Sequence, residues 1–389
     1  MIIPPHLSHL PLPTAEAQAL SDQLSVLIAR EIQAAGGWIS FARYMELALY
    51  APGLGYYSAG SRKLGEGGDF VTAPEMSPLF ARCIARQLAQ LHADDLRTVL
   101  EIGAGSGKLA AELLLELEGL GCAPEGYFIL ELSGDLRERQ QTAIAQRAPA
   151  LLDRVHWLDV LPGSFEGVIL ANEVLDATPA HWVHIAGNRI EEIGATLGNS
   201  GVFEPARRDA NGELLEVATA LALPGGYETE INLTARALVT SLSRLLTRGV
   251  MLLIDYGFPA REFYHPQRSS GTLMCHYRHH AHDDPFAFVG LQDITTHVDF
   301  SAIAAAAMEG GASLLGYATQ AQFLINCGIT ELLSAIPAGD ARAYAPLAAQ
   351  AQKLLSPAEM GELFKVIAFG KQIITPLLGH SRGDKSHTL

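Results

Sequence analysis

The chain has 389 residues, 49% of them hydrophobic and 18% charged, which predicts a globular protein with one large domain and additions, or with two domains. Its formal net charge of -15 argues against broad binding to the phosphates of nucleic acids. An acidic surface instead suits a cationic partner.

The N-terminal residues predict helices and no targeting segment. No Lys or Arg precedes Arg30, and prolines interrupt the apolar residues, which is unlike a signal or transit peptide. Amphipathic patterns predict helices over residues 14–35 and 37–50.

A glycine-rich loop, GEGGDF at residues 65–70, follows these helices. Such a loop is flexible enough to fold over a bound ligand as a lid, and it can equally be a plain linker between helices. Directly after it, residues 72–75 form a capping box with a proline inside the first turn. This motif predicts one helix that runs from Thr72 through Leu88.

The segment TVLEIGAGSGKL at residues 98–109 predicts a strand, a tight turn and the start of a helix. Glycines occupy positions 103, 105 and 107, and such a turn exposes backbone and unpaired N–H groups to a small ligand. The dinucleotide pattern G-x-G-x-x-G would need a third glycine where Lys108 stands. The spacing E-x-G-x-G-x-G, which begins at Glu101, resembles instead the first motif of S-adenosylmethionine-dependent methyltransferases.

Three further apolar strands each end on polar residues. Residues 126–130 are followed by Glu131, residues 155–158 by Asp159, and residues 167–171 by Asn172 and Glu173. Glu131 can accept both hydroxyls of a ribose, and Asp159 can reach an adenine amino group. Because ligands bind outside the carboxyl ends of parallel strands, the order of these residues predicts a nucleoside site.

The rest of the chain completes an α/β fold. Alternation predicts a hairpin over residues 181–193, and the remaining pattern gives a helix at 234–246 and strands at 250–255, 313–317 and 364–369. Seven strands fit a doubly wound, Rossmann-like sheet with an antiparallel last hairpin. We divide the chain into an N-terminal helical lid region at 1–90, core at 91–180, an inserted β-rich segment at 181–232, core with a loop insertion at 233–318, a helical segment with the last strand at 319–375, and a flexible tail at 376–389.

Seven motifs together resemble the MidA family of class I methyltransferases. In chain order they are GGDFVTAPE at 67–75, the glycine motif, LELS at 130–133, ANEVLDATP at 171–179, DYG at 255–257, TTHVDF at 295–300 and TQAQFL at 319–324. The match covers about residues 36 to 370. The resemblance implies S-adenosylmethionine as the cofactor. The mitochondrial members of the family are complex I assembly factors that methylate protein arginine.

The resemblance and the strand ends together assign the candidate site residues. For cofactor binding they are Glu101, Gly103, Ala104, Gly105, Gly107, Glu131, Leu132, Ser133, Asp159, Val160, Asn172, Gly68 and Asp69. For the substrate they are Thr72, Tyr256, Asp293 and His297, of which His297 can instead be a structural histidine.

Catalysis is assigned to Glu173 and Asp176, with Asn172 beside them. A guanidinium nucleophile is cationic and planar, and it needs carboxylates that hold it and localise its charge. Three-residue spacing puts both acids on one face of a helical turn. The alternative is that Asp176 caps a helix and Glu173 faces water.

Cysteine and histidine give no metal site. The four cysteines form no C-x-x-C pair, which indicates a reducing compartment. The histidine-rich stretch at residues 275–282 lacks the paired spacing of zinc sites and contains Arg278.

No stretch has the length and continuity of a membrane helix. We therefore expect a cytoplasmic protein without membrane insertion, which can still attach to a membrane complex through a partner. The sequence does not decide the oligomeric state, for which a homodimer is one option.

Three functions remain open at this point. The first is a protein arginine methyltransferase, the second is a small-molecule methyltransferase, and the third is a cofactor-binding assembly factor with little turnover. The acids at positions 173 and 176 favour an enzyme.

Overall fold

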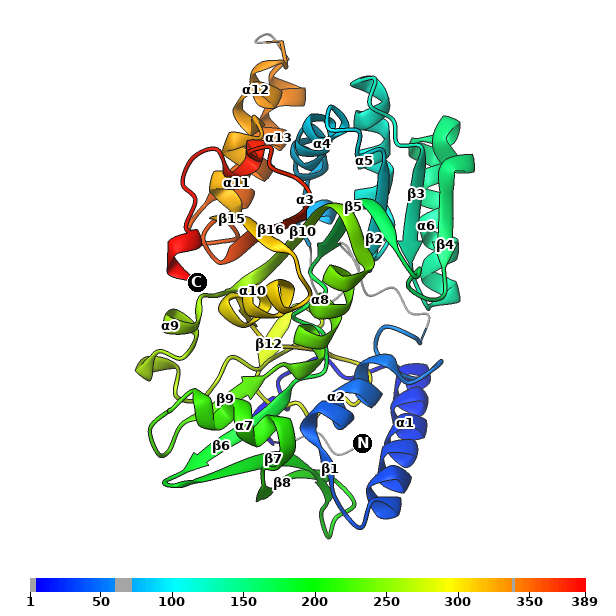
Figure 1. The fold of residues 1–389 in the computed structure, drawn as a ribbon. Coiled ribbons are helices and arrows are strands. Elements are labelled where there is room, and N and C mark those ends of the chain that lie inside the picture. The colour runs from blue at the N-terminus through cyan, green and yellow to red at the C-terminus, as the bar shows by residue number, and fades with distance from the viewer. Residues whose placement is uncertain (1–4, 60–71, 338–339) are drawn as a thin grey trace. The chain divides into compact units, whose positions relative to one another are not determined.

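The computed structural model describes residues 5–59, 72–337 and 340–389 (Figure 1). The chain forms two compact units that alternate along the sequence. The hairpin unit contains the described residues before position 60 with Leu175–Arg236 and Arg261–His297, and the sheet unit contains residues 72–174 with Ala237–Ala260 and Val298–Leu389. The six predicted segments stay a prediction.

A mainly parallel sheet of eight strands forms the centre of the sheet unit. Seven strands follow the order β15-β16-β10-β5-β2-β3-β4, and β14 pairs with β10 off this path. The strands are β2 (Thr98–Ile102), β3 (Gly126–Leu130), β4 (Val155–Leu158), β5 (Phe165–Asn172), β10 (Leu246–Phe258), β14 (Val298–Asp299), β15 (Ser313–Thr319) and β16 (Phe364–Lys371). Only β16 runs antiparallel to its neighbours, β10 and β15. The predicted α/β class is confirmed, and β14 was missed because two residues are too short for a periodic signal.

Helices pack beside this sheet. They are α3 (Ala73–Met76), α4 (Pro78–His92), α5 (Lys108–Gly119), α6 (Gly134–Arg147), α8 (Leu233–Leu245, which begins in the hairpin unit), α10 (Phe300–Glu309), α11 (Gln320–Asn326), α12 (Ile329–Ser334) and α13 (Ala341–Leu355). Consecutive helices α4, α5 and α6 pack against one another (Figure 1). Leu113 and Ile129 are fully buried in the shared apolar core, which holds the strand ends in fixed positions.

The hairpin unit has two smaller sheets. The first has the order β1-β7-β6-β9 with β8 beside β7, and the second has the order β12-β11-β13. Its elements are α1 (Ala15–Ala34), β1 (Ile39–Ser40), α2 (Phe41–Tyr50), β6 (His181–Ala186), β7 (Arg189–Leu197), β8 (Phe203–Asp209), α7 (Gly212–Ala220), β9 (Glu228–Ile231), α9 (Ala260–Phe263, which begins in the sheet unit), β11 (Met274–Tyr277), β12 (His280–His282) and β13 (Asp293–Thr295). The predicted hairpin is confirmed by the antiparallel pairing of β6 with β7.

The prediction of one helix from Thr72 through Leu88 is wrong. The structure has α3 and α4 separated by Ser77, which is extended with φ -153° and ψ 135°. The residue before a proline is disfavoured in the helical region, and Pro78 follows Ser77. The Ser77 hydroxyl then caps α4 by accepting a hydrogen bond from the Leu79 N–H.

The C-terminal residues, expected to be a flexible tail, pack against the sheet unit. The Gly379 N–H donates to Gln87 Oε1 at 2.8 Å, and the Lys385 N–H donates to the Tyr317 carbonyl oxygen at 2.6 Å. Two short 3-10 helices, Leu378–His380 and Ser386–Thr388, lie in this segment. In the described residues, no helix is both long and apolar enough to cross a membrane.

Candidate active site

The glycine turn joins β2 to α5. Gly103, Gly105 and Gly107 have φ angles of 68°, 53° and 82°, a left-handed conformation that favours glycine. A Cβ atom on Gly103 would lie 2.9 Å from the Val174 side chain, and one on Gly107 would lie 2.6 Å from Gln140 Cα. Gly107, the N-cap residue of α5, has no side chain to cap the helix, and the Ser106 hydroxyl accepts a long hydrogen bond of 3.4 Å from the Lys108 N–H.

This turn lies where the order of the strands reverses. From β2 the chain proceeds to β3 and β4 on one side, and it then returns to β5 and β10 on the other side. Open parallel sheets bind ligands at the carboxyl ends of their strands at such a reversal. The residues directly after β2, β3, β4 and β5 are therefore the candidates for ligand binding.

Glu131, directly after β3, is held by two donors. The Ser133 N–H donates to Glu131 Oε1 at 2.9 Å, and Gln140 Nε2 donates to Glu131 Oε2 at 3.0 Å. Gln140 Nε2 also donates to the Gly105 carbonyl oxygen at 3.0 Å. The carboxylate is thus oriented from the glycine turn, and its oxygens keep further lone pairs for a ligand.

Arg137 forms hydrogen bonds with the carboxyl ends of both β3 and β4. Its guanidinium donates to the carbonyl oxygens of Glu131 and Leu158 at 2.7 and 2.9 Å, and to Asp159 Oδ1 at 2.7 Å. The Asp159 carboxylate is otherwise largely exposed.

Two large apolar side chains are exposed after the same strands. Leu132 follows Glu131 and is 79% exposed, and Val160 follows Asp159 and is 74% exposed. Apolar side chains beside a few placed polar groups suit the flat face of a nucleoside base.

Glu173 has a strained and well-supported backbone at the end of β5. Its φ angle is 52°, unusual for a residue with a side chain. Its N–H donates to the Ile254 carbonyl oxygen at 2.8 Å, its Oε1 accepts from Asn172 Nδ2 at 3.0 Å, and the next N–H, of Val174, donates to Asp255 Oδ2 at 3.2 Å. Asn172 Oδ1 is buried and accepts no hydrogen bond from the described residues.

Glu101, near the end of β2, is 2% exposed and accepts a hydrogen bond from the Tyr127 hydroxyl at 2.7 Å. Burial raises the pKa of Glu101 to about 7, and the Tyr127 hydrogen bond opposes that rise. Its contact with a cofactor remains a prediction.

Glu75 of α3 contacts the glycine turn. The Ser106 hydroxyl donates to the Glu75 carboxylate, and Lys108 Nζ donates to the Glu75 carbonyl oxygen at 2.6 Å. The predicted capping box is wrong at Thr72, whose side chain makes no cap hydrogen bond to α3. Gly68 and Asp69, predicted to approach the cofactor, lie outside the described residues.

The predicted acids beyond β5 are divided between the two units. Glu173 belongs to the sheet unit, and Asp176 belongs to the hairpin unit with Asp293. Asp176 is 5% exposed and Asp293 is 2% exposed. The Tyr57 hydroxyl donates to Asp293 Oδ1 at 3.0 Å. The pKa of Tyr57 is raised well above its usual value, mainly because the side chain is buried. The charge of Asp293 raises the pKa further, and the charge of Asp176 contributes less.

Two other predicted substrate residues, His297 and Tyr256, contact side chains of their own units. The His297 N–H donates to Thr272 Oγ1 at 3.1 Å in the hairpin unit. In the sheet unit, the Tyr256 ring packs 5.3 Å from the Phe364 ring, between centroids.

The histidine-rich stretch is a hairpin of β11 and β12. Arg278 and His279 form its turn with φ angles of 48° and 65°. Among the described residues, no group of three or more His, Cys, Asp or Glu side chains is arranged to hold a metal ion.

Sequence reasoning missed Gln140, Arg137 and Tyr57. Gln140 is fully buried, and it lies four residues before the buried Ile144 on the same face of α6, which was a usable signal. Tyr57 and Asp293 are 236 residues apart, and no local pattern announces that contact.

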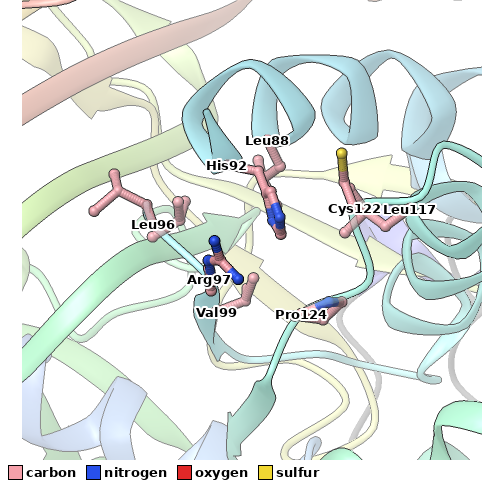
Figure 2. A pocket seen from close by; sticks show the side chains of 9 residues that line it. Leu88, His92, Leu96, Arg97, Val99, Leu117, Cys122 and Pro124 are labelled. Carbon is pink, nitrogen blue, oxygen red and sulfur yellow. The ribbon is translucent and has the colours of Figure 1, made fainter. Parts of the chain in front are cut away.

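A small hollow lies at the opposite edge of the sheet, at the amino ends of the strands (Figure 2). It is lined by Leu88, His92, Leu96, Arg97, Val99, Leu117, Cys122, Pro124 and Val168. Its free space is close to that of one water molecule, which is too little for a nucleoside.

Comparison with known proteins identifies the family. A family model described as "Putative S-adenosyl-L-methionine-dependent methyltransferase" matches residues 79–318. A crystal structure of a Burkholderia thailandensis protein bound to S-adenosyl-homocysteine is 51% identical, covers 98% of this chain and 100% of that chain, and superposes with a TM-score of 0.95.

Two curated relatives are named "Protein arginine methyltransferase NDUFAF7, mitochondrial". The Danio rerio protein is 28% identical over 85% of this chain and 83% of its own length. The Mus musculus protein is 29% identical over 85% of this chain and 81% of its own length. The expectation of a cytoplasmic location is wrong by this comparison, because both relatives are named as mitochondrial.

The family model covers more than half of the chain. The protein is an S-adenosylmethionine-dependent methyltransferase, and the chain belongs to the MidA family.

Proposed function

We propose that the protein transfers the methyl group of S-adenosylmethionine to an arginine side chain of a protein. The names of the zebrafish and mouse relatives support this acceptor. The observation that carries the proposal is Glu173, an acid held in a strained backbone conformation beyond β5, beside the residue that packs on Gly103. We also infer that the seven strands on the path form a doubly wound class I methyltransferase sheet, with the N-terminal helices as a lid region.

The cofactor site proposed here follows the carboxyl ends of the strands. The ribose hydroxyls donate to Glu131, and the adenine lies between Leu132 and Val160 with its amino group toward Asp159. The methionine part lies over the glycine turn. Its ammonium group fits Asn172 Oδ1, because that buried oxygen accepts no hydrogen bond from the described residues.

Glu173 has a direct role in methyl transfer. The cofactor supplies an electrophilic methyl group on a sulfonium. A guanidinium is cationic and its lone pairs are delocalised, so it is a poor nucleophile in water. The Glu173 carboxylate accepts hydrogen bonds from one side of the guanidinium, which concentrates positive charge there and fixes the attacking nitrogen toward the methyl group. The new N–C bond forms as the S–C bond breaks, S-adenosylhomocysteine leaves as a neutral thioether, and the attacking nitrogen loses one proton to water.

The catalytic role of Asp176 and the substrate role of Asp293 stay predictions. Both carboxylates belong to the hairpin unit and are buried, and the Tyr57 hydroxyl donates to Asp293 Oδ1 at 3.0 Å.

The test is a labelling experiment with cell extract. The purified protein is incubated with extract proteins and tritiated S-adenosylmethionine, the protein fraction is acid-hydrolysed, and the labelled amino acids are separated by chromatography. We expect the label in methylated arginine, and we expect none with Gly105→Val, the matched variant without cofactor binding. Label in methylated lysine or only in the small-molecule fraction would contradict the proposed acceptor.

A further inference from the structure

We propose that Gln140 is a positioning residue that aligns the ribose-binding and methionine-binding halves of the cofactor site. Its side chain lies inside the sheet unit and is fully buried. Three groups hold its amide: Nε2 donates to the Gly105 carbonyl oxygen and to Glu131 Oε2, both at 3.0 Å, and Oε1 accepts from Trp157 Nε1 at 2.9 Å. One side chain is therefore hydrogen-bonded to three places: the glycine turn, the residue after β3, and strand β4.

Only an amide of this length satisfies all three partners. Gln140 uses both donors on the glycine turn and on Glu131, and its acceptor on the indole N–H. The missing side chain at Gly107 lets the backbone of α6 come this close, since a Cβ atom there would lie 2.6 Å from Gln140 Cα. Replacement of the amide leaves buried polar groups without partners, which is costly.

The consequence is a preorganised distance between the two halves of the site. Gln140 fixes one oxygen of Glu131 and the carbonyl of Gly105 relative to each other, so a ligand that spans both finds them already aligned. This inference rests on the proposed placement of the ribose at Glu131. Gln140 does not touch the ligand in this arrangement, and it acts through Glu131 and Gly105.

The first experiment compares two glutamines on one helix. Gln140→Glu removes both donors, sets a carboxylate against Glu131 and the Gly105 carbonyl oxygen, and keeps an acceptor for Trp157. Gln141→Glu makes the same chemical change at the next position of α6, which is exposed. We expect calorimetry to show that Gln140→Glu raises the Kd of S-adenosylhomocysteine about tenfold or more, whereas Gln141→Glu leaves it unchanged.

A double-variant cycle separates positioning from a general structural role. In a Glu131→Gln background, the new amide can donate to the carboxylate of Gln140→Glu, so the second change should raise the Kd by a smaller factor than in the wild type. Equal factors in both backgrounds contradict the proposal. Should Gln140→Glu fail to fold, Gln140→Met is measured in its place, and a wild-type Kd for that variant also overturns the proposal.

The single variant Glu131→Ala distinguishes this inference from the proposed cofactor site. An unchanged Kd in Glu131→Ala overturns the ribose placement and the role of Gln140 with it. A raised Kd in Glu131→Ala, together with a wild-type Kd in Gln140→Glu, overturns only the role of Gln140.

Discussion

The two ends of the strands in the central sheet carry different side chains. We call the side with the carboxyl ends of the strands the carboxyl edge and the side with their amino ends the amino edge. At the carboxyl edge, Glu131, Asn172 and Glu173 are oriented by hydrogen bonds from neighbouring loops and helices. At the amino edge, the hollow in Figure 2 is lined mainly by apolar side chains, and Arg97 pairs with the exposed acids Asp95 and Glu125. The proposed site therefore lies at one edge of the sheet, where parallel strands bring polar loop residues to the same place.

The largest effect is expected for a glycine at the carboxyl edge. Gly105→Val puts a β-branched side chain at a φ angle of 53° and into the space of the ligand, so binding of S-adenosylhomocysteine should fall below detection by calorimetry. Gly121→Val is the matched control at the amino edge, with a φ angle of 70° and open space around its Cβ position. Equal losses of binding in both variants would break the distinction between the edges.

Glu173→Gln should separate binding from turnover. The amide keeps the size of the side chain and loses the charge that holds the acceptor, so we expect kcat to fall about 100-fold while the Kd of S-adenosylhomocysteine stays the same. Kinetics with the acceptor found by the labelling experiment measure this. The control is Glu125→Gln, an exposed acid at the amino edge. Wild-type turnover of Glu173→Gln would remove this acid from the mechanism.

Glu101→Gln should change how stability depends on pH. The pKa of Glu101 is raised by burial from 4.5 to about 7, so between these values the folded state binds a proton that the unfolded state has lost. The wild type therefore loses stability as pH rises through this window, and the variant does not. We expect the variant to gain about 1–3 kcal/mol of unfolding free energy relative to the wild type between pH 5 and pH 8.

Urea unfolding of both proteins at the two pH values measures this difference. A difference that does not change with pH would mean that Glu101 is ionised throughout and is available to a cationic part of the cofactor.

The smallest effect is expected for Arg137→Met. Loss of its hydrogen bonds to the ends of β3 and β4 should loosen the ribose and adenine end of the site and raise the Kd of S-adenosylhomocysteine about fivefold. Arg97→Met is the matched control, because Arg97 pairs only with exposed acids at the amino edge among its described partners. An unchanged Kd for Arg137→Met would show that this end of the site does not need the arginine.

The predictable part of the site is the part that local sequence encodes. The glycines and the residues after β2, β3 and β5 follow from short patterns, because a strand that ends in a turn leaves the same signal wherever it occurs. Pro78 predicts the break in the helix at Ser77. The prediction of one continuous helix followed instead from the helix-start motif at residues 72–75. The contact of Tyr57 with Asp293 depends on tertiary packing across 236 residues, which no local pattern carries.

Hydrogen–deuterium exchange with and without S-adenosylhomocysteine tests the position of the site most directly. Exchange of backbone amides slows where a ligand restricts local opening. The carboxyl edge should be protected, in peptides that contain residues 103–107 and 131–133, while peptides from residues 92–97 and 121–125 at the amino edge exchange as before. Protection at the amino edge without protection at the glycine turn would contradict a cofactor site at the strand ends.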